Sequence, residues 1–505
     1  MRLDQRKMGV LLTYVSEAIK ILTTLVYTPV MLRLLGDNEY GLYQTVSSTV
    51  AYLGLLSLGF GSAYVRYHSR YRVKDDADGI TRLNGMFILV FCAMSLICLA
   101  AGGVMIGNAR AVFGDKLTAA ELEQSKLLMA VLIISMAITF PNSVFNCYIT
   151  AHEHFIFQKL LIVVQNLLNP CLTLPLLLLG YGSVAVVTVS AVLTLVVFAS
   201  NLYYCLKKLG MKFTFRGLEF SLLKEMAVFT FFIFLNQIID QVNWAVDKFL
   251  LVRMIGPAMV TVYSVGAQIN SLYIQMSTAV SSVFIPKVNH IVADSDDNQA
   301  LTNLMTKVGR IQYIILALIL TGFVFFGKPF IGLWAGAGKD QAYDVALLLM
   351  VPVTVSLIQN LGIEIQRAKN MHRARSVVYA CLAAGNVVLS IFLIPQWGCV
   401  GAAAGTAISL VLGNILFMNW YYHKKIGLDM RYFWKEILRL LPATVAVCLF
   451  GLVYTYFVRV SGWMMLALSA AVFAVVYAAM MWLLGLNSYE KQLFKKMLYK
   501  LSRVK

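Results

Sequence analysis

The sequence LRLLGDNEYGLY, Leu32 to Tyr43, recurs in altered form as LVRMIGPAMVTVY, Leu251 to Tyr263. Both segments follow a long apolar stretch, and their shared residues keep a constant spacing of 220 positions. Arg33, Gly36 and Tyr43 of the first segment fall on Arg253, Gly256 and Tyr263 of the second. This match indicates an internal duplication that extends well beyond one helix.

Three further matches occur in the same order along the chain, at shifts of 216 to 218 residues. Tyr203–Gly210 resembles Tyr421–Gly427, Gly182 falls on Gly398, and Asn169 falls on Asn386. Each match alone is weak, but their common order favours two related halves. We predict one lobe at residues 1–221, a second at 222–428, and an unpaired extension of two helices at 429–505.

The composition places the whole chain in a membrane. Of the 505 residues, 60% are hydrophobic and only 13% are charged, whereas soluble domains are roughly half apolar and about a quarter charged. Spanning helices need about 20 apolar residues, and lipid admits only helices or closed barrels. We predict an all-α integral membrane protein with fourteen transmembrane helices, in two pseudo-symmetric six-helix lobes plus a two-helix C-terminal extension. The predicted spans are 9–33, 41–65, 83–107, 125–148, 159–180, 184–206, 226–252, 257–285, 310–334, 343–366, 376–395, 398–422, 438–458 and 463–486.

Positive charge predicts the orientation of these spans. The formal net charge is +18, and most Lys and Arg residues fall on one side if the N-terminus is cytoplasmic, as the positive-inside rule expects. An even number of spans then places both termini in the cytoplasm. Because the basic residues lie on short loops, the charge does not indicate a nucleic-acid partner. No catalytic motif, metal-ligand spacing or cofactor site occurs, so the sequence does not indicate an enzyme.

Ionisable residues inside the spans mark the candidate binding site, because charges in hydrocarbon usually face a cavity or each other. Span one carries Glu17 and Lys20 on one helical face, and the repeat partners of these residues are Gln237 and Asp240. We expect a polar central cavity lined by Glu17, Lys20, Asn236, Gln237, Asp240, Asn243, Gln268 and Gln275. The candidate ion-coupling groups, for H⁺ or Na⁺, are Glu17, Asp240 and Asp247. The alternative is structural polar packing between helices.

A second candidate set lies at the predicted cytoplasmic mouth. Arg66 and Arg70 are one helical turn apart, and Arg367 and Lys369 close the tenth span. A guanidinium group can bind two oxygens of one phosphate at once, so we expect these residues to bind a diphosphate. The alternative is that they are ordinary positive-inside anchors.

The chain resembles the polysaccharide (Wzx-type) flippases of the multidrug/oligosaccharidyl-lipid/polysaccharide (MOP) exporter superfamily. The likeness is carried by LTTLVYTPVMLRLLGDNEYGLYQ, with its LG-x(3)-YG-x-Y core at Leu35 to Tyr43. YITAHEHF (Tyr148–Phe155) and GCVGAAAGTAIS (Gly398–Ser409) add to it. The motifs are patterns of small and aromatic residues, and the likeness to the family covers essentially the whole chain.

The resemblance implies alternating access that moves a polyprenyl-diphosphate-linked oligosaccharide from the inner to the outer leaflet of the bacterial cell membrane, for surface polysaccharide biosynthesis. It also implies membrane lipids as partners, with a polysaccharide polymerase and glycosyltransferases as candidate protein partners. Three alternatives stay open: a lipid II flippase, a cation-coupled multidrug exporter, and a membrane scaffold that recruits glycan-assembly enzymes. The eighth span carries no charge, whereas lipid II flippases typically have an arginine there.

Overall fold

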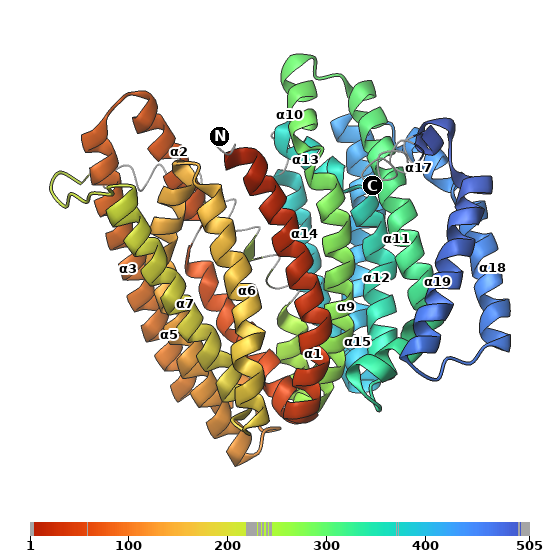
Figure 1. Ribbon diagram of the computed structural model, residues 1–505, viewed down its shortest axis with the longest axis horizontal. Helices are drawn as coiled ribbons and strands as arrows, with labels where there is room; N and C mark the ends of the chain where they lie inside the picture. Colours follow the sequence, from red (N-terminus) through yellow and green to blue (C-terminus); the bar gives the residue numbers. More distant parts are fainter. Residues whose placement is uncertain are drawn as a thin grey trace, which may run out of the picture. The chain divides into compact units, whose positions relative to one another are not determined.

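The computed structural model describes residues 5–492 and residue 495, except 58, 219–229, 231–233, 235–236, 239–240, 242–244, 370 and 372. Within these residues the secondary structure is helical, and no strand occurs. Eleven helical stretches are long and apolar enough to cross a membrane. The prediction of an all-helical membrane protein is therefore confirmed (Figure 1).

Twelve of the fourteen predicted spans coincide with these stretches, because the first stretch, Leu12–Val73, covers two of them. About half of the seventh span, 226–252, lies outside the described residues. The eighth is helical over Pro257–Ser282 but is not among the eleven, since its serine, threonine and glutamine side chains lower its hydropathy. The number fourteen and the two six-helix lobes stay predictions.

The chain divides into two compact units. Unit one comprises Met1–Ser264 and Val387–Ala402, and unit two comprises Val265–Asn386 and Ala403–Lys505. These units are defined by contacts, and the lobe boundaries that we predict from the sequence repeat remain a prediction. The helices that begin in unit one are α1 (Gln5–Ala51), α2 (Phe60–Val73), α3 (Ala77–Gly107), α4 (Ala109–Phe113), α5 (Ala119–Ala151), α6 (Phe155–Leu178), α7 (Gly182–Tyr203) and α9 (Pro257–Ser282). The 3₁₀ segment η1 (Tyr52–Ser57) follows α1, and the π-helical turn η2 (Tyr204–Lys208) extends α7.

Unit two begins within α9 and contains α10 (Ile285–Asp294), α11 (Asn298–Ala335), α12 (Gln341–Ile358), α13 (Asn360–Ala368) and most of α15 (Cys399–Leu410). Helix α14 (Arg373–Trp397) begins in unit two and ends in unit one. The remaining helices of unit two are α16 (Met418–Tyr421), α17 (Met430–Leu438), α18 (Leu441–Phe457) and α19 (Trp463–Met480), with π-helical turns η3 (Val411–Phe417), η4 (Tyr422–Ile426) and η5 (Met481–Gly485).

Two glycines of the opening motif shape α1. Gly36 breaks the helix with φ 74° and ψ 174°, a conformation that residues with a Cβ rarely adopt. Gly41 lies where α1 meets the start of α9, and a Cβ built there would be 1.8 Å from the carbonyl oxygen of Pro257. The motif therefore encodes a break followed by a close helix–helix contact within unit one.

Residues that the sequence repeat aligns have matching local structure. The aligned glycine pairs all have positive φ: Gly36 and Gly256 (74° and 134°), Gly182 and Gly398 (60° and 59°), Gly210 and Gly427 (64° and 82°). The Asn169 side chain donates to Ser190 at 2.9 Å, and its counterpart Asn386 donates to Thr406 at 3.2 Å. Matching geometry at matching positions is what a duplicated sequence predicts.

A buried ion cluster ties the C-terminal extension to the rest of unit two. Arg310 on α11 is 3% exposed and donates to both carboxylate oxygens of Glu490, at 2.6 and 2.9 Å. It also donates to the carbonyl oxygens of Gly485, at 3.0 Å, and of Glu436. One side chain of α11 thus contacts α17, the end of η5 and the segment after η5.

Candidate functional site

Lys20 lies on α1 sixteen residues before the break at Gly36, which is about 24 Å along the axis at ~1.5 Å per residue. It lies fifteen residues after the start of α1 at Gln5, so it is near the middle of a hydrocarbon layer of about 30 Å. A lysine at that depth costs ~2.5–3.5 kcal/mol on insertion scales unless it meets water or a partner. The position therefore calls for a polar surrounding.

The structure supplies that surrounding as a cavity between α1 and α6, which pack side by side (Figure 1). We call it the Lys20 cavity, and its volume is about 300 Å³. Its lining residues are Lys20, Thr23, Thr24 and Tyr27 from α1, and Gln165, Asn166, Asn169 and Pro170 from α6. One cation, two threonine hydroxyls and three amides make this cavity suitable for an anionic group.

Pro170 adds a further polar group to the wall. A proline within a helix has no N–H to donate to the carbonyl four residues earlier, which here belongs to Asn166, another lining residue. The neighbouring Asn169 is held in place by its hydrogen bond to Ser190 of α7. The middle of α6 thus offers both amide side chains and a backbone carbonyl that lacks its intrahelical donor.

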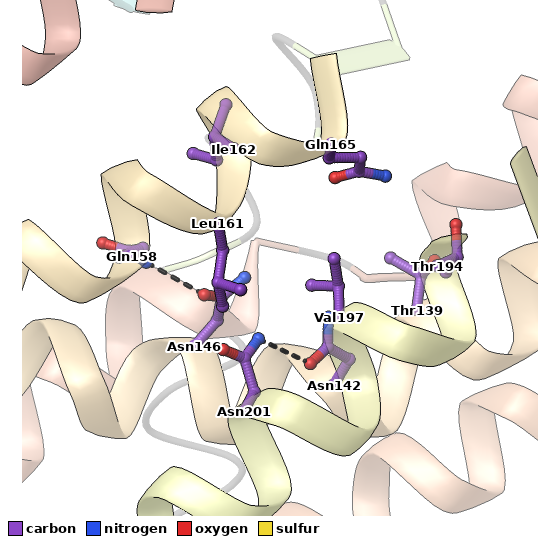
Figure 2. Close-up of a pocket in the computed structure, with 10 residues that line it drawn as sticks. All are labelled: Thr139, Asn142, Asn146, Gln158, Leu161, Ile162, Gln165, Thr194, Val197 and Asn201. Carbon is purple, nitrogen blue, oxygen red and sulfur yellow. Dashed lines mark hydrogen bonds between the residues drawn. The ribbon is translucent and has the colours of Figure 1, made fainter. Parts of the chain in front are cut away.

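A second cavity in unit one, of about 210 Å³, lies among α5, α6 and α7 (Figure 2). We call it the amide cavity. Its lining residues are Thr139, Asn142, Asn146, Gln158, Leu161, Ile162, Gln165, Thr194, Val197 and Asn201. Asn201 donates to Asn142 at 2.9 Å, and Gln158 donates to Asn146 at 3.0 Å. Gln165 lines both cavities.

The predicted central-cavity residues fall into three groups. Glu17 and Lys20 are both exposed on α1, but only Lys20 lines one of the two cavities. Gln237, Gln268 and Gln275 are half-buried, and Gln275 donates to Ser271 of its own helix at 3.3 Å. Asn236, Asp240 and Asn243 lie outside the described residues.

Asp247, a predicted ion-coupling residue, is fully buried in unit one. Its two carboxylate oxygens accept hydrogen bonds from different helices: Tyr263 donates at 2.6 Å and Ser390 at 3.2 Å. The adjacent Lys248 donates to Gln44 at 3.1 Å. Two hydroxyl groups therefore donate to the Asp247 carboxylate, a setting in which a carboxylate can hold a proton or a small cation.

The predicted mouth residues have different surroundings in the two units. In unit one, Arg66 and Arg70 are exposed on α2, while the nearby Tyr64 and Tyr67 of the same helix are buried. In unit two, Arg367 is exposed and bonds Glu364 at 2.8 Å.

Lys369 is only 9% exposed. It contacts Asp296 and Asn298, each at 2.7 Å. Lys369 is therefore held by one carboxylate and one amide.

The sequence interpretation missed the amide cavity. Its amides lie on three helices, whereas the site prediction started from charged residues within the spans. A signal was present, because Asn142 and Asn146 are one turn apart on α5, and Gln158 and Gln165 are two turns apart on α6. Asparagine and glutamine at helical spacing within spans indicate polar contacts between helices, as charged residues do.

Three known proteins share extended similarity with this chain. The "Uncharacterized membrane protein EpsK" of Bacillus subtilis is 23% identical over 483 residues, covering 93% of each chain. The "Putative O-antigen transporter" of Shigella flexneri is 18% identical over 400 residues, covering 77% of this chain and 90% of that protein. The inward closed structure of the lipid II flippase MurJ superposes with a TM-score of 0.74 at 15% identity, covering 94% of this chain and 97% of MurJ.

The fold is therefore that of the membrane transporters of the MOP superfamily. The model of the family "Polysaccharide biosynthesis protein" matches residues 7–292, and the chain belongs to this family. It is a multi-pass membrane protein of the transporter type and not an enzyme, as the sequence predicted.

Proposed function

We propose that this protein moves a polyprenyl-diphosphate-linked oligosaccharide from the inner to the outer leaflet of a bacterial cell membrane by alternating access. Family membership supports a role in polysaccharide biosynthesis. The observation that carries the proposal is the Lys20 cavity, a cationic and amide-lined space at mid-membrane depth. The distribution of positive charge along the sequence supports a cytoplasmic location for both termini.

The chemistry of the Lys20 cavity suits the diphosphate of such a cargo. A diphosphate cannot enter hydrocarbon unless its charge is compensated, and the Lys20 ammonium supplies a charge-assisted donor. The side-chain amides of Gln165 and Asn166 add N–H donors, and the Thr23 and Thr24 hydroxyls add two more. The polyprenyl chain remains in lipid and needs no binding site of its own.

Arg66 and Arg70 suit the first encounter with the cargo. Both are exposed on α2, Arg66 near its middle and Arg70 in its last turn, and guanidinium groups bind phosphate oxygens bidentately. In this proposal they attract the diphosphate at the cytoplasmic surface before it reaches Lys20. Tyr64 and Tyr67 are buried, so they pack the helix and do not offer a stacking surface for sugars.

Asp247 is our choice for the coupling group. Its burial and its hydroxyl partners, Tyr263 and Ser390, allow it to be neutral when protonated or to coordinate a sodium ion. Either event changes the charge at a point where three segments of unit one meet. Such a change provides a direct means of biasing one conformation against another.

A test in cells that depend on the protein for surface polysaccharide uses Lys20→Gln. The loss of one charge-assisted hydrogen bond, ~1.5–3 kcal/mol, corresponds to a loss of export of about 10- to 100-fold. Lys20→Arg should keep most of the export because it keeps the charge. The matched control is Lys126→Gln, at a surface lysine paired with Glu123 at 2.6 Å, which should export normally. Normal export by Lys20→Gln at equal membrane abundance would refute the role of Lys20.

A further inference from the structure

We propose that the amide cavity is a separate glycan subsite, which binds a neutral sugar residue of the cargo through its hydroxyl groups. The inference rests on the proposed function, because it takes the cargo to be a lipid-linked saccharide. It assigns the two parts of the cargo to different cavities: the diphosphate lies in the Lys20 cavity, and the adjoining sugar lies among α5, α6 and α7.

The lining of the amide cavity matches an uncharged, hydroxyl-rich ligand. None of its ten lining residues is ionisable, while five are amides and two are threonines. An amide offers both a donor and an acceptor, which is the combination that a sugar hydroxyl can use. The remaining lining residues, Leu161, Ile162 and Val197, suit the apolar C–H face of a pyranose ring.

The same lining argues against other ligands. An organic cation would call for a carboxylate or aromatic faces, and neither occurs among the lining residues. A phosphate would call for a cation, and the cation in this region, Lys20, lines the neighbouring cavity instead. The volume of about 210 Å³ is several times the ~30 Å³ of one water in the liquid, which leaves room for a single sugar ring.

One buried atom points to a missing donor. Asn201 is 1% exposed, and its side-chain nitrogen donates to Asn142 (Figure 2). Its carbonyl oxygen Oδ1 accepts no hydrogen bond from any residue that the structure describes. A buried acceptor without a donor is costly to a folded protein, and this one belongs to a residue that lines the cavity.

The connection between the two cavities fits the covalent structure of the cargo. Gln165 lines both, so their occupants would be neighbours on either side of one side chain. In a polyprenyl-diphosphate glycan the first sugar is joined directly to the distal phosphate. A diphosphate held by Lys20 therefore presents that sugar to Gln165 and the amides beyond it.

The test measures binding by the purified full-length protein in nanodiscs with two probes. One probe is undecaprenyl diphosphate, and the other is the polyprenyl-diphosphate glycan extracted from the cells that produce the protein. Asn142→Leu/Asn201→Leu removes both partners of one buried hydrogen bond together, which is milder for folding than removing one. Gln165→Leu provides a second variant, and Ser200→Leu, on α7 beside Asn201 but outside the cavity lining, is the control.

We expect the wild type to bind the glycan-bearing lipid at least tenfold more tightly than undecaprenyl diphosphate. The double variant should lose that advantage while keeping its affinity for undecaprenyl diphosphate, and Ser200→Leu should behave as wild type. Equal affinity of the wild type for the two probes would overturn the glycan subsite, as would an unchanged preference in both Asn142→Leu/Asn201→Leu and Gln165→Leu. If the wild type binds neither probe, the proposed function itself fails.

Discussion

Replacing Arg310 with glutamine should destabilise the protein by about 3–5 kcal/mol, the usual cost of removing one partner of a buried ion pair. Arg310 and Glu490 are 3% and 4% exposed, and the two hydrogen bonds between them measure 2.6 and 2.9 Å. The substitution leaves the Glu490 carboxylate buried without its cation. It also removes the donors to the carbonyls of Gly485 and Glu436.

The chain contains a matched control for this substitution. Arg367 forms an ion pair of similar length, 2.8 Å with Glu364, but is 64% exposed. An exposed pair contributes about 0–1 kcal/mol, so Arg367→Gln should have little effect on stability. Arg310→Met/Glu490→Met, which removes both charges, should be less destabilising than Arg310→Gln.

The free energy of unfolding can be measured by titrating the detergent-solubilised protein with denaturing detergent. A thiol-reactive dye reports unfolding, because Cys98, Cys205 and Cys399 are buried in the folded state. If Arg310→Gln costs no more than Arg367→Gln, the buried cluster does not hold the C-terminal extension in place, and the reasoning is wrong.

Three further predictions concern other parts of the chain. Gly41→Ala should strongly reduce the yield of folded protein in size-exclusion chromatography, since its Cβ would overlap the carbonyl of Pro257, whereas Gly103→Ala, with open space around it, should not. Arg66→Gln/Arg70→Gln should weaken undecaprenyl diphosphate binding and reduce its salt dependence; an unaltered salt dependence would contradict the encounter role. His152 lies outside the spans, and burial, followed by the nearby Arg72, lowers its pKa. Near the ordinary histidine pKa of ~6.5, the unfolded state therefore binds more protons than the folded state. The stability of the protein should fall as the pH drops through that region. A pH–stability curve should be flatter for His152→Gln.

The ion cluster also changes how the scaffold alternative should be tested. A deletion of the whole tail from residue 487 would remove Glu490 and break its contact with Arg310. Loss of transport after that deletion would then be explained by a destabilised fold and would not test the scaffold role. Deleting 496–505 alone keeps Glu490 and removes basic residues of the tail, so it separates recruitment from stability. Normal transport with lost enzyme recruitment would favour the scaffold role.

The sequence predicted a helical membrane protein and most of its spans, because a spanning helix needs one continuous run of apolar residues. It also aligned Gly36 with Gly256, and both glycines have a positive φ that residues with a Cβ rarely adopt. A charged residue inside an apolar span can be recognised from sequence alone, and this rule selected Lys20, which lines a cavity; its role in binding stays a prediction. The amide cavity was missed because Asn142, Gln158 and Asn201 come together only through the packing of three helices.

The central claim is that Lys20 compensates the charge of a diphosphate during its passage, and translocation by the purified protein in proteoliposomes tests it most directly. The measurement compares wild type, Lys20→Arg and Lys20→Gln for transfer of the extracted polyprenyl-diphosphate glycan between leaflets. We predict transfer by wild type and Lys20→Arg, and a rate about 10- to 100-fold lower for Lys20→Gln. Transfer by Lys20→Gln at the wild-type rate would contradict the account.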